Sequence, residues 1–109
     1  MQRYGFVIRL RSEHRDTYLQ LHKLVWPAVE QTLRSANIRN YSIFLHGDLL
    51  FSYYEYVGED HEADLARVAA DPQTQAWWKL TDPCQESLND SGKGWARMSE
   101  VWHLTEEVL

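Results

Sequence analysis

The sequence has one cysteine, Cys84, and only 11 lysines and arginines against 16 acidic residues. A single cysteine has no partner for an intrachain disulfide, which suits a protein of the reducing cytoplasm. A formal net charge of −5 offers no basic surface that would neutralise phosphates. We therefore expect a cytoplasmic protein that does not bind nucleic acid.

Long apolar runs are absent as well. No stretch approaches the roughly 20 apolar residues that cross a bilayer, and the first ten residues, MQRYGFVIRL, lack the pattern of a signal peptide. Only three prolines and five glycines occur, and they form no linker between separate parts of the chain. The 109 residues suffice for one hydrophobic core but not for two. We expect a single domain over residues 1–109 with no membrane partner.

The N-terminal third predicts a strand and an interrupted helix. Residues 4–10 alternate in the manner of a strand, and Ser12 is a candidate cap for a helix that begins near Glu13. Pro27 falls inside this helical pattern, where it would remove a backbone hydrogen bond and clash with the preceding turn. Because proline fits the first position of a helix, we expect a break around residues 23–26.

The rest of the chain continues the alternation of strands and helices. In chain order we expect strands over 38–45 and 49–57, joined by a short turn at 46–48; helices over 60–70 and from 72, the latter capped by Asp71; a loop over 82–94; and a last strand over 98–104. The order βαββαβ predicts a ferredoxin-like α+β sandwich with an antiparallel sheet.

The predicted strand over 49–57 has no polar face. Apolar and aromatic residues occupy both of its sides, with Leu49, Phe51 and Tyr53 on one and Leu50, Tyr54 and Tyr56 on the other. Helices cover one face of such a sheet, so a monomer would expose an apolar surface on the other. We expect a C2 homodimer closed across these faces; the alternative is a face that binds only a ligand.

The stretch TYLQLHKLVWP places Tyr18, His22 and Trp26 four residues apart, along nearly one face of a helix. A histidine side chain exchanges a proton near neutral pH because its ordinary pKa is about 6.5. The alternative for His22 is a half-buried structural histidine. The histidines show no zinc-type spacing, and no G-x-G-x-x-G or Walker motif occurs, so we expect no metal site and no phosphate-binding loop.

Trp77 and Trp78 are adjacent on a predicted helix and point about 100° apart, so they cannot share one core stripe. Either one packs in the core and the other at the dimer boundary, or one stacks on the apolar face of a sugar. Lys79 and Asp82 follow closely and are candidate rim charges or solvated residues. Tyr41, on the second strand, either packs in the core or an interface or reaches a hydroxylated ligand.

Several motifs, taken in order, resemble the L-rhamnose mutarotase family over almost the whole chain. Besides the N-terminal strand they are Y-x-x-x-H-x-x-x-W-P at 18–27, N-Y-S-I-F-L at 40–45, W-W-K at 77–79 and E-V-W-H-L at 100–104. This resemblance implies a ferredoxin-like dimer that acts on a monosaccharide without a metal or organic cofactor. Residues 80–98 differ from the pattern of the family, which leaves the identity of the sugar open.

The same resemblance implies roles for individual residues. It makes His22 the proton donor and Tyr18, Tyr41, Trp77 and Trp78 the residues that contact the sugar. Interconversion of α and β anomers needs an acid at the ring oxygen and a base at the anomeric hydroxyl, with the roles reversed on closure. His22 would supply the acid.

The sequence leaves the identity of the base open. A tyrosine, a carboxylate such as Glu55 or Glu100, or a water molecule could serve as the base.

The reaction has a leading hypothesis and alternatives. The leading hypothesis is an isomerase, an L-rhamnose mutarotase. A mutarotase for L-fucose or another sugar is the alternative within this reaction class, since pocket hydrogen bonds would distinguish the sugars. A ferredoxin-like binding protein and a cofactor-free monooxygenase are the alternatives outside it, because one fold hosts many functions.

Overall fold

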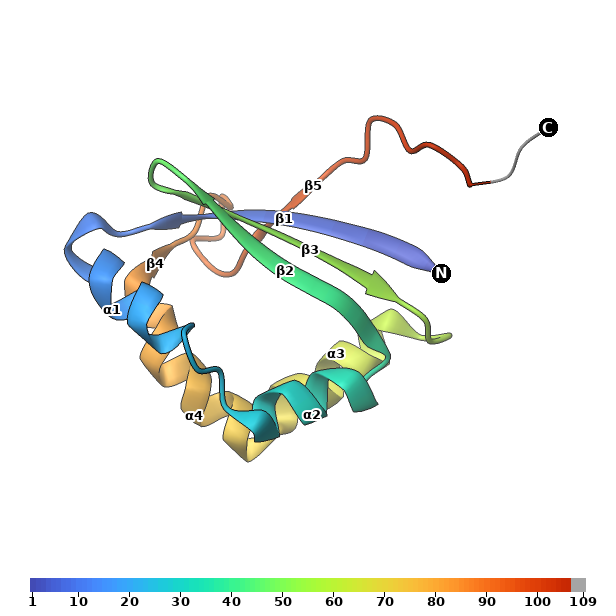
Figure 1. Cartoon of the computed structure of the whole chain (residues 1–109), viewed down its shortest axis with the longest axis horizontal. Helices are drawn as coiled ribbons and strands as arrows, with labels where there is room; N and C mark the ends of the chain where they lie inside the picture. The colour runs from blue at the N-terminus through green and yellow to red at the C-terminus, as the bar shows by residue number, and fades with distance from the viewer. Residues whose placement is uncertain (107–109) are drawn as a thin grey trace.

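The computed structural model describes residues 1–106 and places a curled sheet opposite a layer of helices (Figure 1). The strands are β1 (Gln2–Leu10), β2 (Ile38–His46), β3 (Leu49–Tyr56), β4 (Gln85–Glu86) and β5 (Ala96–Met98). The helices are α1 (Arg15–Leu21), α2 (Pro27–Ser35), α3 (His61–Ala70) and α4 (Pro72–Thr81), with 3-10 turns η1 (Ser12–His14) and η2 (Asp82–Cys84).

All strands pair in antiparallel fashion, in the order β2-β3-β1-β4, and β5 also pairs with β1. The last two strands share one edge of β1: Gln85 of β4 lies opposite Leu10, and Met98 of β5 lies opposite Gly5. The helices lie on one side of this sheet (Figure 1). The predicted α+β fold with an antiparallel sheet is confirmed.

The first helical segment is interrupted where the proline predicts. α1 ends at Leu21, residues 22–26 are not helical, and α2 begins with Pro27 at a position where its missing N–H is not needed. The expected break is confirmed. The expected cap at Ser12 is wrong, because Ser12 is itself part of η1 and the preceding residue, Arg11, makes no capping hydrogen bond with its side chain.

Two other local predictions are confirmed. The Asp71 carboxylate accepts hydrogen bonds from the backbone N–H and the hydroxyl of Thr74, both at 2.9 Å, and Pro72 opens α4. Between β2 and β3 the two-residue turn is formed by Gly47 and Asp48, with Gly47 at φ 61°, a conformation that favours glycine.

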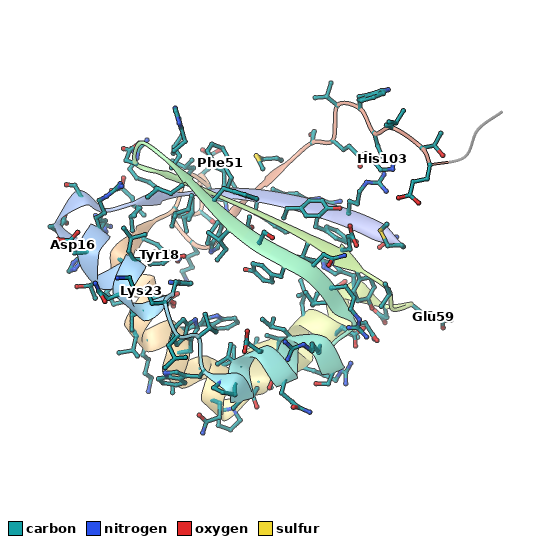
Figure 2. All side chains as sticks on the ribbon, viewed as in Figure 1. Asp16, Tyr18, Lys23, Phe51, Glu59 and His103 are labelled. Atoms are coloured by element: carbon teal, nitrogen blue, oxygen red, sulfur yellow. The ribbon has the colours of Figure 1, made fainter. Side chains whose placement is uncertain are left out.

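The expected strand over 98–104 is wrong. β5 ends at Met98, and the chain beyond it forms an extended arm that leaves the body and carries His103 (Figures 1 and 2). β4 instead falls within the predicted loop over 82–94. The difference arises because pairing with the edge of β1 stabilises these short strands, a contact that the turn-rich composition of the segment does not reveal.

The core lies between the sheet and the helices. Along β3 every second residue is buried and faces the helices, namely Leu50, Ser52, Tyr54 and Tyr56. The opposite sheet face carries a cross-strand row of Phe44, Phe51, Val7 and Ala96, in which Phe44 is 63% exposed and Phe51 lies on the side away from the helices (Figure 2). The apolar open face that the sequence predicted is therefore present.

A buried carboxylate ties β3 to α3 and to the start of β2. Asp64 of α3 accepts hydrogen bonds from the Tyr56 hydroxyl, from the Asn37 amide at 3.0 Å and from the Arg67 guanidinium. These three donors lower the pKa of Asp64 from 3.8 to about 2. The charged form of Asp64 therefore stabilises the folded state.

We predict that Asp64→Asn lowers the free energy of unfolding at pH 7, because an amide attracts these donors less than a carboxylate. A folded-state pKa below the unfolded value contributes stability that is fully present above the unfolded pKa. That contribution is lost as the pH falls from 3.8 towards about 2. Urea unfolding measured across this range should therefore show the difference between wild type and variant shrinking.

The exposed loop residue Asp90 provides a matched control, since Asp90→Asn removes a carboxylate that no described group contacts by hydrogen bond or ion pair within residues 1–106. This variant should unfold like the wild type at every pH. A stability difference for Asp64→Asn that stays constant from pH 7 downwards would contradict the prediction.

Candidate functional site

A cavity of about 630 Å³ lies between the sheet and the helix layer, with Tyr18 of α1 in its wall (Figure 2). The five residues predicted to form the site all line it: Tyr18, His22, Tyr41, Trp77 and Trp78. An adjoining, more apolar cavity of about 490 Å³ shares four of them, all but Tyr18. These volumes are in the range of small-molecule sites. The tertiary structure thus brings together residues that lie up to 60 positions apart in the chain.

His22 is the first residue after α1, in the break before Pro27. Its Nδ1 lies 2.9 Å from the carbonyl oxygen of Tyr18, and since a carbonyl only accepts, Nδ1 carries a hydrogen and donates it. The ring stacks on Tyr18 at 4.2 Å between centroids and meets the edge of Trp77 at 5.4 Å. These contacts hold the imidazole in one orientation and leave Nε2 as the nitrogen that can exchange a proton with a ligand.

The adjacent tryptophans of α4 have different environments. Trp77 is only 6% exposed and makes edge contacts with His22 and, at 5.3 Å, with Trp26. Trp78 is 39% exposed, although it lines the same cavity. One tryptophan therefore packs inside and supports the histidine, while the other offers an accessible indole, as residues about 100° apart on a helix must.

The two phenols at the cavity are poor proton acceptors. Tyr18 is buried, its hydroxyl accepts a hydrogen bond from the Gln85 amide at 3.3 Å, and burial raises the pKa of Tyr18 far above its usual value. Tyr41 is 41% exposed as a whole residue, yet its phenol group is desolvated, and this burial raises the pKa of Tyr41 to about 12. Both hydroxyls keep their protons near neutral pH and can donate hydrogen bonds.

The two glutamates considered as bases lie away from this cavity. Glu55 accepts hydrogen bonds from the Asn40 amide at 2.6 Å and from the Tyr53 hydroxyl at 2.8 Å, on the sheet face opposite the helices. Glu100 lies in the arm beyond β5 and pairs with Arg3 at 3.0 Å. Neither lines the cavity. The alternation of β3 explains the position of Glu55, since Tyr54 and Tyr56 point to the core.

Sequence reasoning missed part of the wall. Asp82, which the sequence offered as a candidate rim charge, lines the cavity. The segment after it adds residues that sequence reasoning did not name: Gln85, Ser87, Gly92, Lys93, Gly94 and Trp95. The Ser87 hydroxyl donates to the carbonyl of Gly94 at 2.7 Å, and the Asn89 amide donates to that of Lys93 at 2.9 Å, so the loop is held by its own hydrogen bonds. The only sequence signal was that residues 80–98 depart from the pattern of the family.

Within residues 1–106, no three or more histidine, cysteine, aspartate or glutamate side chains gather in a way that would hold a metal ion. In the same part of the chain, no helix has the length and apolar character needed to cross a bilayer.

The sequence is similar to known mutarotases. The family model for L-rhamnose mutarotase matches residues 3–104. An L-rhamnose mutarotase of Opitutus terrae is 34% identical over 106 residues, covering 95% of this chain and 99% of the relative. An L-fucose mutarotase of Xanthomonas campestris pv. campestris is 35% identical over 116 residues, covering 99% of this chain and 92% of the relative.

Two solved structures have a fold similar to that of this chain. The crystal structure of an L-rhamnose mutarotase from Formosa agariphila superposes with a TM-score of 0.76 at 20% identity, covering 96% of this chain and all of that one. The tetracenomycin F2 cyclase of Streptomyces glaucescens, a polyketide cyclase, gives 0.71 at 13% identity, covering 98% of this chain and 100% of that one. At these identities the structures show a shared fold. Because the family model covers nearly the entire sequence, the chain belongs to the L-rhamnose mutarotase family, a family of sugar isomerases.

Proposed function

We propose that this protein is a mutarotase that interconverts the α and β anomers of L-rhamnose, and that it works as a ferredoxin-like cytoplasmic homodimer without a cofactor. The observation that carries the proposal is the convergence of Tyr18, His22, Tyr41, Trp77 and Trp78 on one cavity in a member of this family.

The proposed chemistry is acid–base opening of the pyranose ring. His22, protonated, donates from Nε2 to the ring oxygen while the bond between this oxygen and the anomeric carbon breaks. A base takes the proton of the anomeric hydroxyl, whose oxygen becomes the aldehyde carbonyl. Rotation of the aldehyde followed by closure on its other face, with both proton transfers reversed, yields the other anomer. No electrons are gained or lost overall.

The other residues of the site would bind the sugar. The Tyr18 and Tyr41 phenols retain their protons and can donate to sugar hydroxyls, while the accessible indole of Trp78 can stack on the apolar face of the ring. L-fucose is the second candidate substrate, because the Xanthomonas relative bears that name at an identity similar to that of the rhamnose relative.

We predict that His22→Ala lowers the rate of anomer exchange by about 10²–10⁴-fold, the usual share of a general acid. Saturation-transfer NMR on L-rhamnose measures this exchange directly. His22→Asn should be equally slow, because an amide forms hydrogen bonds but does not donate a proton at neutral pH. His46→Ala, at an exposed position beside the β2–β3 turn, is the matched control and should exchange anomers at the wild-type rate.

A folded His22→Ala protein with nearly wild-type exchange would make this histidine structural. Absence of exchange in the wild type with both L-rhamnose and L-fucose would instead contradict the proposed activity.

We predict that substitutions of the two tryptophans have different effects on sugar binding and on stability. Trp78→Ala should weaken sugar binding with little loss of stability, since Trp78 is 39% exposed and lines the cavity. Trp77→Ala should also lower the free energy of unfolding by about 3–5 kcal/mol, the usual cost of truncating a buried tryptophan. Quenching of intrinsic fluorescence by L-rhamnose and urea unfolding measure the two effects. Normal binding by Trp78→Ala would show that its indole does not contact the sugar.

The proposed dimer is supported by the open sheet face, where Phe44 and Phe51 lie side by side in adjacent strands. An apolar face of this kind is usually covered by a partner. We predict a dimer in sedimentation at micromolar concentration, and Phe44→Glu should shift it towards monomer. Leu24→Glu, at a residue 79% exposed outside this face, should leave the dimer intact. A monomeric wild type would refute the dimer.

A further inference from the structure

We propose that Asp82 is the general base that partners His22, taking the proton of the anomeric hydroxyl as the ring opens and returning it as the ring closes. This inference rests on the proposed mutarotase function and assigns the group that sequence reasoning left open.

The position of Asp82 supports this role. Asp82 lines the same cavity as His22 and Trp78. It follows the last residue of α4 with helical dihedral angles, φ −57° and ψ −42°, and comes four residues after Trp78. Residues four apart on a helix share one face, so the carboxylate is one turn along from the accessible indole. A sugar stacked on Trp78 would therefore lie next to it.

The carboxylate of Asp82 has no competing partner. Within residues 1–106, no hydrogen bond or ion pair engages its side chain, whereas Glu86, also in the segment after α4, pairs with Arg9 and Arg11. Acidic side chains with a structural role in this protein accept hydrogen bonds, as Asp71 does from Thr74. An unpaired carboxylate in a cavity wall is an acceptor available to a ligand hydroxyl.

Its surroundings suit proton transfer as well. Asp82 is exposed as a whole residue, but partial desolvation raises the pKa of Asp82 above the usual value of 3.8, so its carboxylate is a better base. This shift supports the role only together with the position in the cavity.

The other titratable groups of the cavity are unsuited to accept this proton. The raised pKa values of Tyr18 and Tyr41 keep both phenols protonated. The ammonium group of a lysine such as Lys93 has no acceptor site, and His22 is committed to the ring oxygen. In this scheme one proton leaves His22 for the ring oxygen while another passes from the anomeric hydroxyl to Asp82. Closure reverses both transfers, so protons and bonds balance over the cycle.

The first test is Asp82→Asn, which preserves size but does not accept the proton. We expect anomer exchange of L-rhamnose, measured by saturation-transfer NMR, to fall by about 10²–10⁴-fold. Quenching of tryptophan fluorescence by L-rhamnose should change only a few-fold. Asp90→Asn is the matched control, because Asp90 is exposed in the same segment but does not line the cavity, and its exchange should be unchanged.

The second test separates proton transfer from positioning. In Asp82→Ala, added sodium formate should restore exchange in proportion to its concentration, while sodium chloride at equal ionic strength should not. The rate that formate gives without protein is subtracted. Nearly wild-type exchange in folded Asp82→Asn would overturn the base assignment and leave the mutarotase function standing. If Asp82→Ala loses exchange and formate does not restore it, the base assignment is overturned and Asp82 only positions other groups. A wild-type protein that exchanges no anomers would overturn both proposals.

Discussion

The break in the first helical segment is the constraint on which the rest of the site depends. Pro27 cannot continue a helix from its N-terminal side, so α1 ends at Leu21 and α2 starts anew. The ring of His22 then turns back onto the carbonyl oxygen of Tyr18 instead of continuing a regular helix surface. Trp77 contacts His22 at the start of the break and Trp26 at its end, so α4 holds both ends of the interruption.

α4 therefore positions one tryptophan in the core and another at the cavity. Its Asp71 cap and Pro72 set where the helix begins, and that start determines which of the two adjacent tryptophans points inward. Trp77 supports the histidine from the core, and Trp78 remains available at the cavity. Asp82 follows where α4 ends, so one element positions an accessible indole and an unpaired carboxylate in the wall of the cavity that His22 also lines.

The sheet separates the two surfaces of the molecule. On β3, Tyr54 and Tyr56 face the helices, while Phe51 and Glu55 face away. The cavity side carries the groups to which we assign sugar binding and proton transfer, and the far side presents the apolar row that we propose a partner covers. The loop after η2 adds the remaining wall of the cavity. Because this loop is the part of the chain that departs from the family pattern, we expect it to influence which sugar is accepted.

Local chemistry alone was enough to predict several features from the sequence. The break at Pro27, the cap at Asp71 and the turn at Gly47 each depend on the conformational limits of residues next to one another. The resemblance to a known family named the five residues that meet at the cavity. The tertiary structure decided the pairing of β4 and β5 with β1, the placement of Glu55 and Glu100 away from the site, and that of Asp82 within it. These outcomes depend on contacts and burial between segments far apart in the chain, which neither spacing nor propensity encodes.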